Sequence, residues 1–128
     1  ASYLRRHGFG PEAVAGFIPV SGQMMTHFTV RAEQGLATNC ITADAAAPIF
    51  HTRPDAPPML ILMGDHDWPA RLEENQYFVA IQKIAGHRGV ELKVIPDRTH
   101  GTITGRLPEP GDPAQAAMLE FIRAHGGR

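Results

Sequence analysis

A continuous apolar run near the middle of the chain limits the possible folds more than any other feature of the sequence. It spans residues 59–64 (Met-Leu-Ile-Leu-Met-Gly) and follows a Pro-Pro pair. Because the run does not alternate with polar residues, it is typical of a strand that is covered on both faces. Two further strand-like runs lie at residues 15–21 and at residues 91–95, the latter ended by Pro96.

Helical patterns lie between and after these runs. Residues 70–86 predict an amphipathic helix, and residues 113–125 predict another, with Asp112 as its N-cap and a proline at its first position. Shorter helices are predicted at residues 3–7 and 41–47. The apolar stripe of the first long helix consists of Tyr77, Phe78, Ile81, Ile84 and Ala85.

The order of these elements predicts an α/β fold with a mostly parallel sheet and flanking helices, because helical units separate the strands. We expect residues 1–128 to form a single, partial domain. The first strand would leave an apolar edge open, so we expect a further segment before residue 1. Residues 22–56 form an irregular insertion, which either shapes a pocket or is an ordinary surface excursion.

The composition excludes several classes of protein. With 43% hydrophobic and 20% charged residues, the chain is not intrinsically disordered, and its net charge of −1 argues against binding to nucleic acid or to a membrane surface. No apolar run approaches the roughly 20 residues of a membrane span. Cys40 is the only cysteine, and no signal-peptide pattern is present, which together favour the cytoplasm.

An acid and a histidine follow two neighbouring predicted strands. Asp67 lies three residues after Gly64, and His100 lies five residues after Ile95. The carboxyl ends of parallel strands meet at one rim of a sheet, where ligands usually bind. A carboxylate there can orient an imidazole and stabilise its charged form, as in a Ser-His-Asp triad. Asp65 is the alternative acid.

Three segments together resemble the C-terminal half of an α/β-hydrolase of the esterase/lipase and carboxylesterase branch. They are residues 3–8 (YLRRHG) followed by residues 14–22 (VAGFIPVSG), residues 57–67 (PPMLILMGDHD) and residues 99–101 (THG). The resemblance implies a serine hydrolase that acts on small carboxylic esters with a catalytic triad and without a metal or organic cofactor. It gives the acid role to Asp67 and the general-base role to His100.

The nucleophile is missing from this pattern. The serines of the chain are Ser2 and Ser21, and neither lies in a Gly-x-Ser-x-Gly motif. The resemblance makes Ser21 a structural residue near the floor of the site. It therefore implies that the nucleophile and the oxyanion hole lie upstream of residue 1, in an N-terminal half or in a second chain. A homo-oligomer is a further alternative.

Other residues could bind a substrate. Met24 and Met25 could line an acyl pocket or fill the core, and Trp68 could wall the site or anchor the helix that follows it. The chain has seven histidines but no His-x-x-x-His pair, so we expect no metal site.

Two alternative functions remain open at this stage. The chain could be a non-catalytic α/β module whose open edge strand pairs with another chain, which would explain the missing serine. It could also belong to an amidase or a peptidase that uses the same triad.

Overall fold

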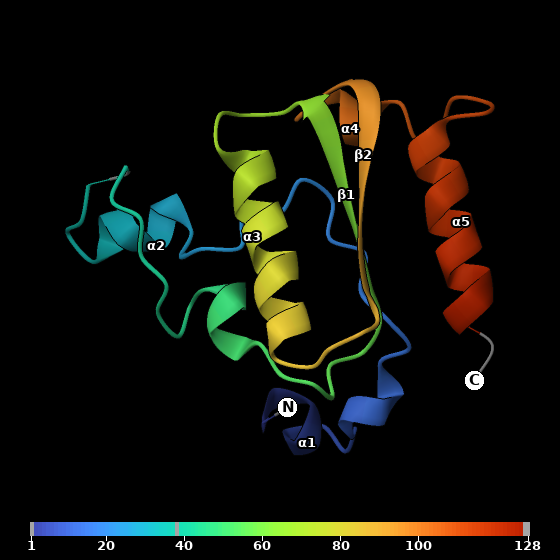
Figure 1. Ribbon diagram of the computed structural model, residues 1–128. Helices are drawn as coiled ribbons and strands as arrows, with labels where there is room; N and C mark the ends of the chain where they lie inside the picture. Colours follow the sequence, from blue (N-terminus) through green and yellow to red (C-terminus); the bar gives the residue numbers. More distant parts are fainter. Residues whose placement is uncertain (1, 38, 127–128) are drawn as a thin grey trace.

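The computed structural model describes residues 2–37 and 39–126 of the chain. Its centre is a parallel pair of strands, β1 (Met59–His66) and β2 (Val90–Thr99), joined by the long helix α3 (Arg71–Ile84). Figure 1 shows α3 on one side of this pair and α5 (Pro113–His125) on the other. The predicted α/β class with parallel strands and flanking helices is confirmed.

Residues 17–21 run parallel to β1 as a third, strand-like segment. Phe17 pairs with Met59 and Val20 pairs with Leu62, but these are isolated bridges and not a continuous strand. Pro19 has no backbone N–H and cannot complete a ladder. On the outer side of the segment, the backbone groups of Ile18 and Val20 have no backbone hydrogen bond to a described residue. The predicted strand at residues 15–21 is therefore an open edge.

The other helices are short. They are α1 (Ser2–Arg6), η1 (Pro11–Ala13), α2 (Phe28–Glu33), η2 (Pro48–His51) and α4 (Thr102–Gly105). The helix predicted at residues 41–47 is wrong, because residues 41–43 have no regular structure and residues 44–47 form bends and a turn. The Asp44 carboxylate accepts hydrogen bonds from the Thr26 hydroxyl and from the Ala46 N–H. Such side-chain bonds offer the backbone an alternative to a helix.

Strand β1 is buried on both faces, as its continuous apolar run predicts. Leu60, Ile61, Leu62 and Met63 are at most 1% exposed. Leu60 and Leu62 belong to the cluster that faces α5, whereas Ile61 and Met63 belong to the cluster that contains Phe78 of α3. The strand therefore supplies side chains to two cores, one on each face of the sheet.

The buried face of α3 differs from the predicted apolar stripe. Tyr77 and Ile84 are 53% and 81% exposed, whereas the polar residues Asn75 and Gln82 are buried. The Asn75 amide donates hydrogen bonds of 2.8 Å to the carbonyl of Gly22 and to that of Arg71. Hydrophobic periodicity does not identify this buried face of α3, because one of its buried side chains, Asn75, is polar and hydrogen-bonds the loop that contains Gly22. At α5, by contrast, the predicted N-cap Asp112 is present.

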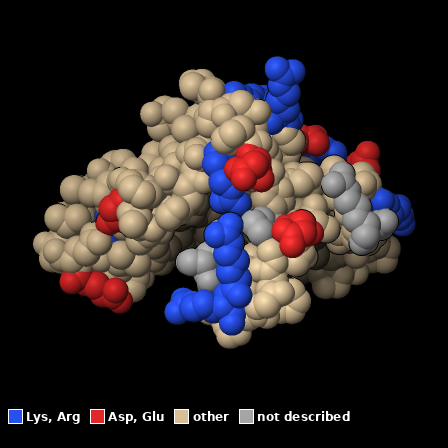
Figure 2. Space-filling view, turned by 90° about the horizontal axis from the view of Figure 1, so that it is seen from below, with Lys and Arg blue, Asp and Glu red and all other residues tan. Residues whose placement is uncertain are grey.

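The surface seen from below carries α1 and is mostly uncharged. Figure 2 shows basic side chains gathered in a line near the middle of this face, with large uncharged areas around them.

Across residues 2–37 and 39–126, no helix combines the length and the apolar character needed to cross a membrane.

Gly64 is required because the backbone of Arg98 in β2 passes close to its Cα atom. A Cβ atom at this position would collide with the backbone carbonyl of Arg98, and no rotamer change can move a backbone atom away. We expect Gly64→Ala to lower the free energy of unfolding by about 2 kcal/mol, measured by urea denaturation. Gly105→Ala is the matched control, since a Cβ there meets nothing within 4 Å. Equal effects of the two substitutions would contradict the role of Gly64.

Candidate active site

Three parallel segments deliver polar side chains to the same rim of the sheet. Ser21 ends the segment that pairs with β1, Asp67 follows β1, and His100 follows β2. The carboxyl ends of parallel strands are the common position of ligand sites in open α/β sheets. The structure thus brings together the two residues that the sequence analysis placed at the rim, and adds Ser21 to them.

Asp67 and His100 are in direct contact. The Nδ1 atom of His100 lies 3.0 Å from Oδ1 of Asp67, whose side chain is only 2% exposed. The Trp68 N–H donates a 2.7 Å hydrogen bond to the same carboxylate oxygen. The indole of Trp68 also stacks on the imidazole, with ring centroids 3.8 Å apart and planes 16° apart. The imidazole of His100 is therefore held at one edge by the Asp67 carboxylate and on one face by the Trp68 indole.

The second ring nitrogen of His100 remains available. No described residue hydrogen-bonds Nε2, and the side chain is 34% exposed. Because Nδ1 faces a carboxylate, this carboxylate favours the tautomer with the proton on Nδ1, which leaves Nε2 as a proton acceptor. A histidine held in this way can serve as a general base toward a group that approaches from outside the described residues.

Ser21 contacts the carboxylate and not the free nitrogen. Its hydroxyl donates to Oδ2 of Asp67 and lies 2.9 Å from Nδ1 of His100. The Ser21 N–H donates to the carbonyl of Leu62 in β1, which fixes Ser21 at the end of the segment that pairs with this strand. Ser21 also has a φ of +54°, in the left-handed region that is uncommon for residues other than glycine. The nucleophile and Asp of a triad bond opposite nitrogens of the histidine, whereas Ser21 and Asp67 share one nitrogen.

Asp65, the alternative acid, lies in another environment. Its carboxylate accepts a 3.1 Å hydrogen bond from the Arg98 N–H and lies 2.9 Å from Nδ1 of His66. Partial burial raises the pKa of Asp65, but hydrogen bonds from the backbone N–H groups of Arg98 and Asp97 and from His66 outweigh this effect and lower it. Asp65 makes no hydrogen bond to His100 and instead joins the ends of β1 and β2.

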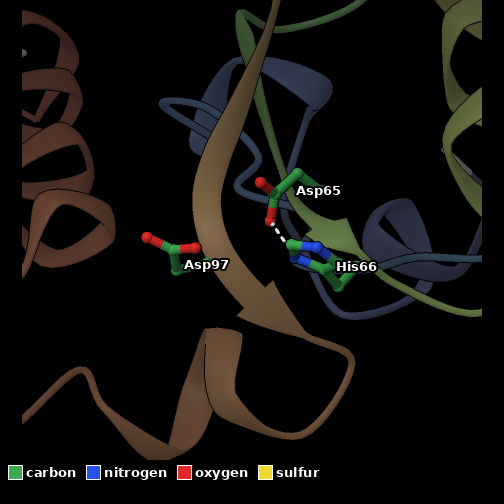
Figure 3. Close-up of side chains that lie close together, drawn as sticks. All are labelled: Asp65, His66 and Asp97. Atoms are coloured by element: carbon green, nitrogen blue, oxygen red, sulfur yellow. Dashed lines mark hydrogen bonds and ion pairs between the residues drawn. The ribbon is translucent and has the colours of Figure 1, made fainter.

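Asp65, His66 and Asp97 are close enough together to hold a metal ion. Their possible ligand atoms lie within 4.8 Å of one another, and Figure 3 shows the pair from β1 beside Asp97 of β2. All three residues are exposed. Exposed acidic groups are often this close without an ion, so the cluster by itself does not define a metal site.

A buried ion pair anchors the segment that carries His100. A nitrogen of the Arg98 guanidinium lies 2.8 Å from the carboxylate of Asp112, and both side chains are almost fully buried. Burial raises the pKa of Asp112, but the hydrogen bonds from Arg98 and from the Gln115 N–H outweigh it and hold this pKa below its ordinary value. The same carboxylate caps α5, so Asp112 joins this helix to the end of β2.

The residues proposed from the sequence as substrate contacts lie around two cavities. Met24 is 3% exposed, packs in the core beside Phe78 and lines an apolar cavity of about 460 Å³. Met25 and Trp68 line a second cavity of about 370 Å³. Trp68 connects the second cavity to His100 through the ring stack.

Sequence reasoning missed two contacts of the site. The sequence predicts a structural Ser21 near the floor of the site but no partner for it, and it gives no role to Arg98. The Ser-Gly pair at a strand end signals a sharp backbone change, but nothing in the sequence indicates that the hydroxyl meets Asp67. Arg98 and Asp112 are 14 residues apart and become partners only through the packing of α5.

Only the comparison with solved structures finds proteins that are similar to this chain. No protein-family model matches the sequence. No curated protein is similar to it at a significant level either.

Several solved structures are similar to the chain, and they are esterases. A propionate-bound form of esterase 2 from the Planctomycetes species Thermogutta terrifontis matches with a TM-score of 0.59 and 21% identity, over 87% of this chain and 41% of the esterase. A paraoxon-phosphorylated form aligns at 26% identity and a TM-score of 0.59, over 84% and 37%. A truncated carbohydrate esterase from gut microbiota matches with a TM-score of 0.61 and 17% identity, over 88% and 43%.

These matches show that the chain has an α/β-hydrolase-like esterase fold, over 87% of its length in the first of them. The chain spans about two fifths of the length of the esterases that it resembles. The expected resemblance is therefore confirmed for the fold.

Loss of the Asp112 charge is expected to destabilise the chain in a pH-dependent way. Asp112→Asn keeps an N-cap side chain but leaves the Arg98 guanidinium buried without its counter-ion, which we expect to cost about 3 kcal/mol near pH 7. Because folding lowers the pKa of Asp112, its carboxylate stabilises the fold above a pH of about 4 and this contribution is lost as the pH falls through the folded pKa. Urea denaturation at pH 7 and at pH 3 measures both effects.

The expected difference between the wild type and Asp112→Asn is therefore larger at pH 7 than at pH 3. Asp55→Asn is the control, since the Arg53–Asp55 ion pair is exposed and contributes little. A difference that does not change with pH would contradict the role of the Asp112 charge.

Proposed function

We propose that this chain supplies the acid and the histidine of a serine hydrolase of carboxylic esters. The observation that carries the proposal is the contact between Asp67 and Nδ1 of His100, with Nε2 left free for a nucleophile. We further propose that the chain is the C-terminal part of the hydrolase and that the nucleophilic serine and the oxyanion hole lie upstream of residue 1.

In the proposed reaction, the upstream serine hydroxyl attacks the ester carbonyl while Nε2 of His100 accepts its proton. The tetrahedral intermediate collapses, His100 protonates the leaving alcohol, and an acyl-enzyme remains. Water, deprotonated by His100, then attacks the acyl group and releases the carboxylic acid and the serine. Asp67 stays ionised throughout and stabilises the imidazolium that forms in each half of the reaction.

The open edge and the apolar cavity support the proposal of an upstream segment. Residues 17–21 leave backbone donors and acceptors unpaired on their outer side, which is the arrangement that another parallel strand can extend. The cavity of about 460 Å³ lies beside Phe17 and Pro19 of the same segment. More than half of the length of each of the similar esterases lies outside the matched part, which is enough for further strands.

We propose that Ser21 positions Asp67 and is not the nucleophile. Together with the Trp68 N–H and His100, its hydroxyl surrounds the Asp67 carboxylate. A buried carboxylate needs such donors because burial without them is costly. The donors also fix which carboxylate oxygen faces the imidazole.

Active-site labelling of the full-length protein that contains residues 1–128 tests the proposed function. An organophosphate is a suitable probe because paraoxon phosphorylates the similar Thermogutta esterase 2. We expect the label on a serine outside these residues. We also expect His100→Gln and Asp67→Asn to slow the labelling on the order of a thousandfold or more.

Asp97→Asn is the control for this experiment, because Asp97 is an exposed acid close to the rim without a contact to His100. A label on Ser21, or an unchanged rate in His100→Gln, would overturn the assignment. If no serine is labelled, the open edge would instead favour a non-catalytic module that pairs with another chain. Hydrolysis of matched ester and amide substrates distinguishes an esterase from an amidase or peptidase.

The role of Ser21 has a test of its own. We expect Ser21→Ala to retain the label on the upstream serine but to lower kcat for ester hydrolysis by about tenfold, with KM nearly unchanged, since Asp67 loses a charge-assisted hydrogen bond. Ser21→Gly loses the same hydroxyl but relieves the positive φ.

Equal losses of kcat in the two variants, with Ser21→Gly the more stable to urea, would assign the effect to the hydroxyl. A recovery of kcat in Ser21→Gly would show that only the backbone geometry matters, and the positioning role would be wrong.

A further inference from the structure

Trp68 lies against the proposed general base but belongs to neither hydrophobic core. Its side chain is 50% exposed, and neither of the two core clusters of the described residues includes it. Its indole instead stacks on the imidazole of His100, with ring centroids 3.8 Å apart. A half-exposed tryptophan contributes less to the fold than a buried one, because much of its apolar surface stays in water. The stack on His100 therefore calls for a role in the site.

The backbone of Trp68 is fixed independently of its indole. The Trp68 N–H donates to Oδ1 of Asp67, and the Trp68 carbonyl accepts a 3.0 Å hydrogen bond from the N–H of Arg71, the first residue of α3. Pro69 follows and favours an extended backbone at Trp68. The indole thus starts from a defined place beside the carboxylate. A substitution of Trp68 removes the indole and leaves these backbone contacts in place.

The hydrogen-bond contacts of His100 hold only one edge of its ring. Among the described residues, Asp67 and Ser21 both contact Nδ1, and none hydrogen-bonds Nε2. Contacts at one ring atom leave the imidazole free to turn about that atom, and such a turn moves Nε2, which lies across the ring. A nearly parallel indole restricts the turn, because a tilted imidazole would lose the stacked contact.

The indole of Trp68 has a second support at the start of α3. The guanidinium carbon of Arg71 lies 5.7 Å from the centroid of the Trp68 ring, within the range of a cation–π interaction. Arg71 is itself only 7% exposed, so its side chain has little freedom to move. An indole that is held in this way can restrain the imidazole, whereas a freely rotating indole could not.

We propose that Trp68 is a positioning residue, whose indole keeps the imidazole of His100 in the orientation that presents Nε2 to the nucleophile. This inference rests on the proposed function, because it concerns the same histidine. The face of an indole also attracts a cation more strongly than a neutral ring, so the contact strengthens when the imidazolium forms during the reaction. An interaction that is stronger in the transition state than in the ground state raises kcat.

A cavity wall is the competing role of Trp68. The indole lines the cavity of about 370 Å³ together with Met25 and Phe28. A wall that contacts the substrate equally in the ground state and in the transition state lowers KM and leaves kcat unchanged. Restraint of the general base acts on kcat instead. The two roles therefore differ in the kinetic constant that responds to a substitution.

Ester hydrolysis by the full-length protein that contains residues 1–128 tests the positioning role. Trp68→Leu keeps an apolar side chain but removes the aromatic face, and we expect kcat for phenyl acetate to fall about tenfold with KM nearly unchanged. Trp68→Phe restores an aromatic face and is expected to recover most of kcat. Tyr77→Leu is the matched control with no expected effect, since Tyr77 is a similarly exposed aromatic residue of α3 outside the cavity.

Two kinetic results would contradict the inference. An unchanged kcat in Trp68→Leu, with or without a raised KM, would leave Trp68 as a cavity wall only. Equal losses of kcat in Trp68→Leu and Trp68→Phe would show that the aromatic face has no part in the effect.

The Nδ1 proton of His100 gives a readout that does not depend on catalysis. In protein with isotope-labelled histidine, a proton between an imidazole and a carboxylate resonates far downfield and is visible by NMR only while it exchanges slowly with water. The signal that His100→Gln lacks belongs to His100. We expect this signal in the wild type and in Trp68→Phe, and its loss in Trp68→Leu, where the ring is no longer held. An equally strong signal in Trp68→Leu would overturn the inference.

A second NMR measurement needs no variant of Trp68 and decides the question if Trp68→Leu does not fold. The ring current of a stacked indole moves the carbon-bound protons of the imidazole upfield. We expect this upfield displacement for His100 in the wild type, and its absence would show that the ring is not held by Trp68.

These measurements separate a failure of this inference from a failure of the proposed function. If the wild type hydrolyses phenyl acetate and Trp68→Leu matches it in kcat and in the Nδ1 proton signal, the positioning role is wrong and the proposed function stands. If no ester is hydrolysed and no serine is labelled, the proposed function is wrong, and the NMR signals alone decide whether Trp68 orients His100.

Discussion

Parallel pairing to β1 determines where each group of the candidate site lies. On one side, β2 follows the register from Met59↔Val90 to Gly64↔Ile95, and the register then shifts so that His66 pairs with Thr99. This irregularity adds residues to β2 immediately before His100, at the point where Gly64 leaves room for the backbone of Arg98. On the other side, the N–H of Ser21 bonds the carbonyl of Leu62. The segment 17–21, β1 and β2 therefore end at the same edge of the sheet. The side chains of Ser21, Asp67 and His100 meet there without a long loop.

The Asp67 carboxylate is the centre of this arrangement. It contacts Ser21, the Trp68 N–H and His100, and its side chain is almost fully excluded from water. Donors from three different segments keep the acid in one orientation. The ion pair of Arg98 with Asp112 fixes the end of β2 from the other side of the sheet. The end of β2 that carries His100 is therefore tied to α5, which packs on one face of the sheet.

The sequence predicts β1, the first half of β2 and both long helices because each has a strong local signal, such as the apolar run at residues 59–64 or the cap at Asp112. The predicted end of β2 at Pro96 is wrong, because the strand continues to Thr99. It also places Asp67 and His100 on one rim, because parallel strands share a direction. It fails where side chains decide the outcome: Asp44 forms a turn where alanines favour a helix, and Asn75 is buried where periodicity expects an apolar residue. The contact between Ser21 and Asp67 joins residues 46 positions apart and has no local signal at all.

The anchoring of β2 to α5 has a consequence for the order in which the chain acquires its structure. Ser21 and His100 are 79 residues apart, and the partner that holds Arg98 lies further on, at Asp112. Contacts of such large sequence separation form late, because the intervening chain must lose its freedom first. During synthesis on a ribosome, the rim cannot be complete until Asp112 has emerged and α5 has docked. Until then the newly made strands expose apolar faces, which makes this interval the one in which the chain most needs protection from aggregation.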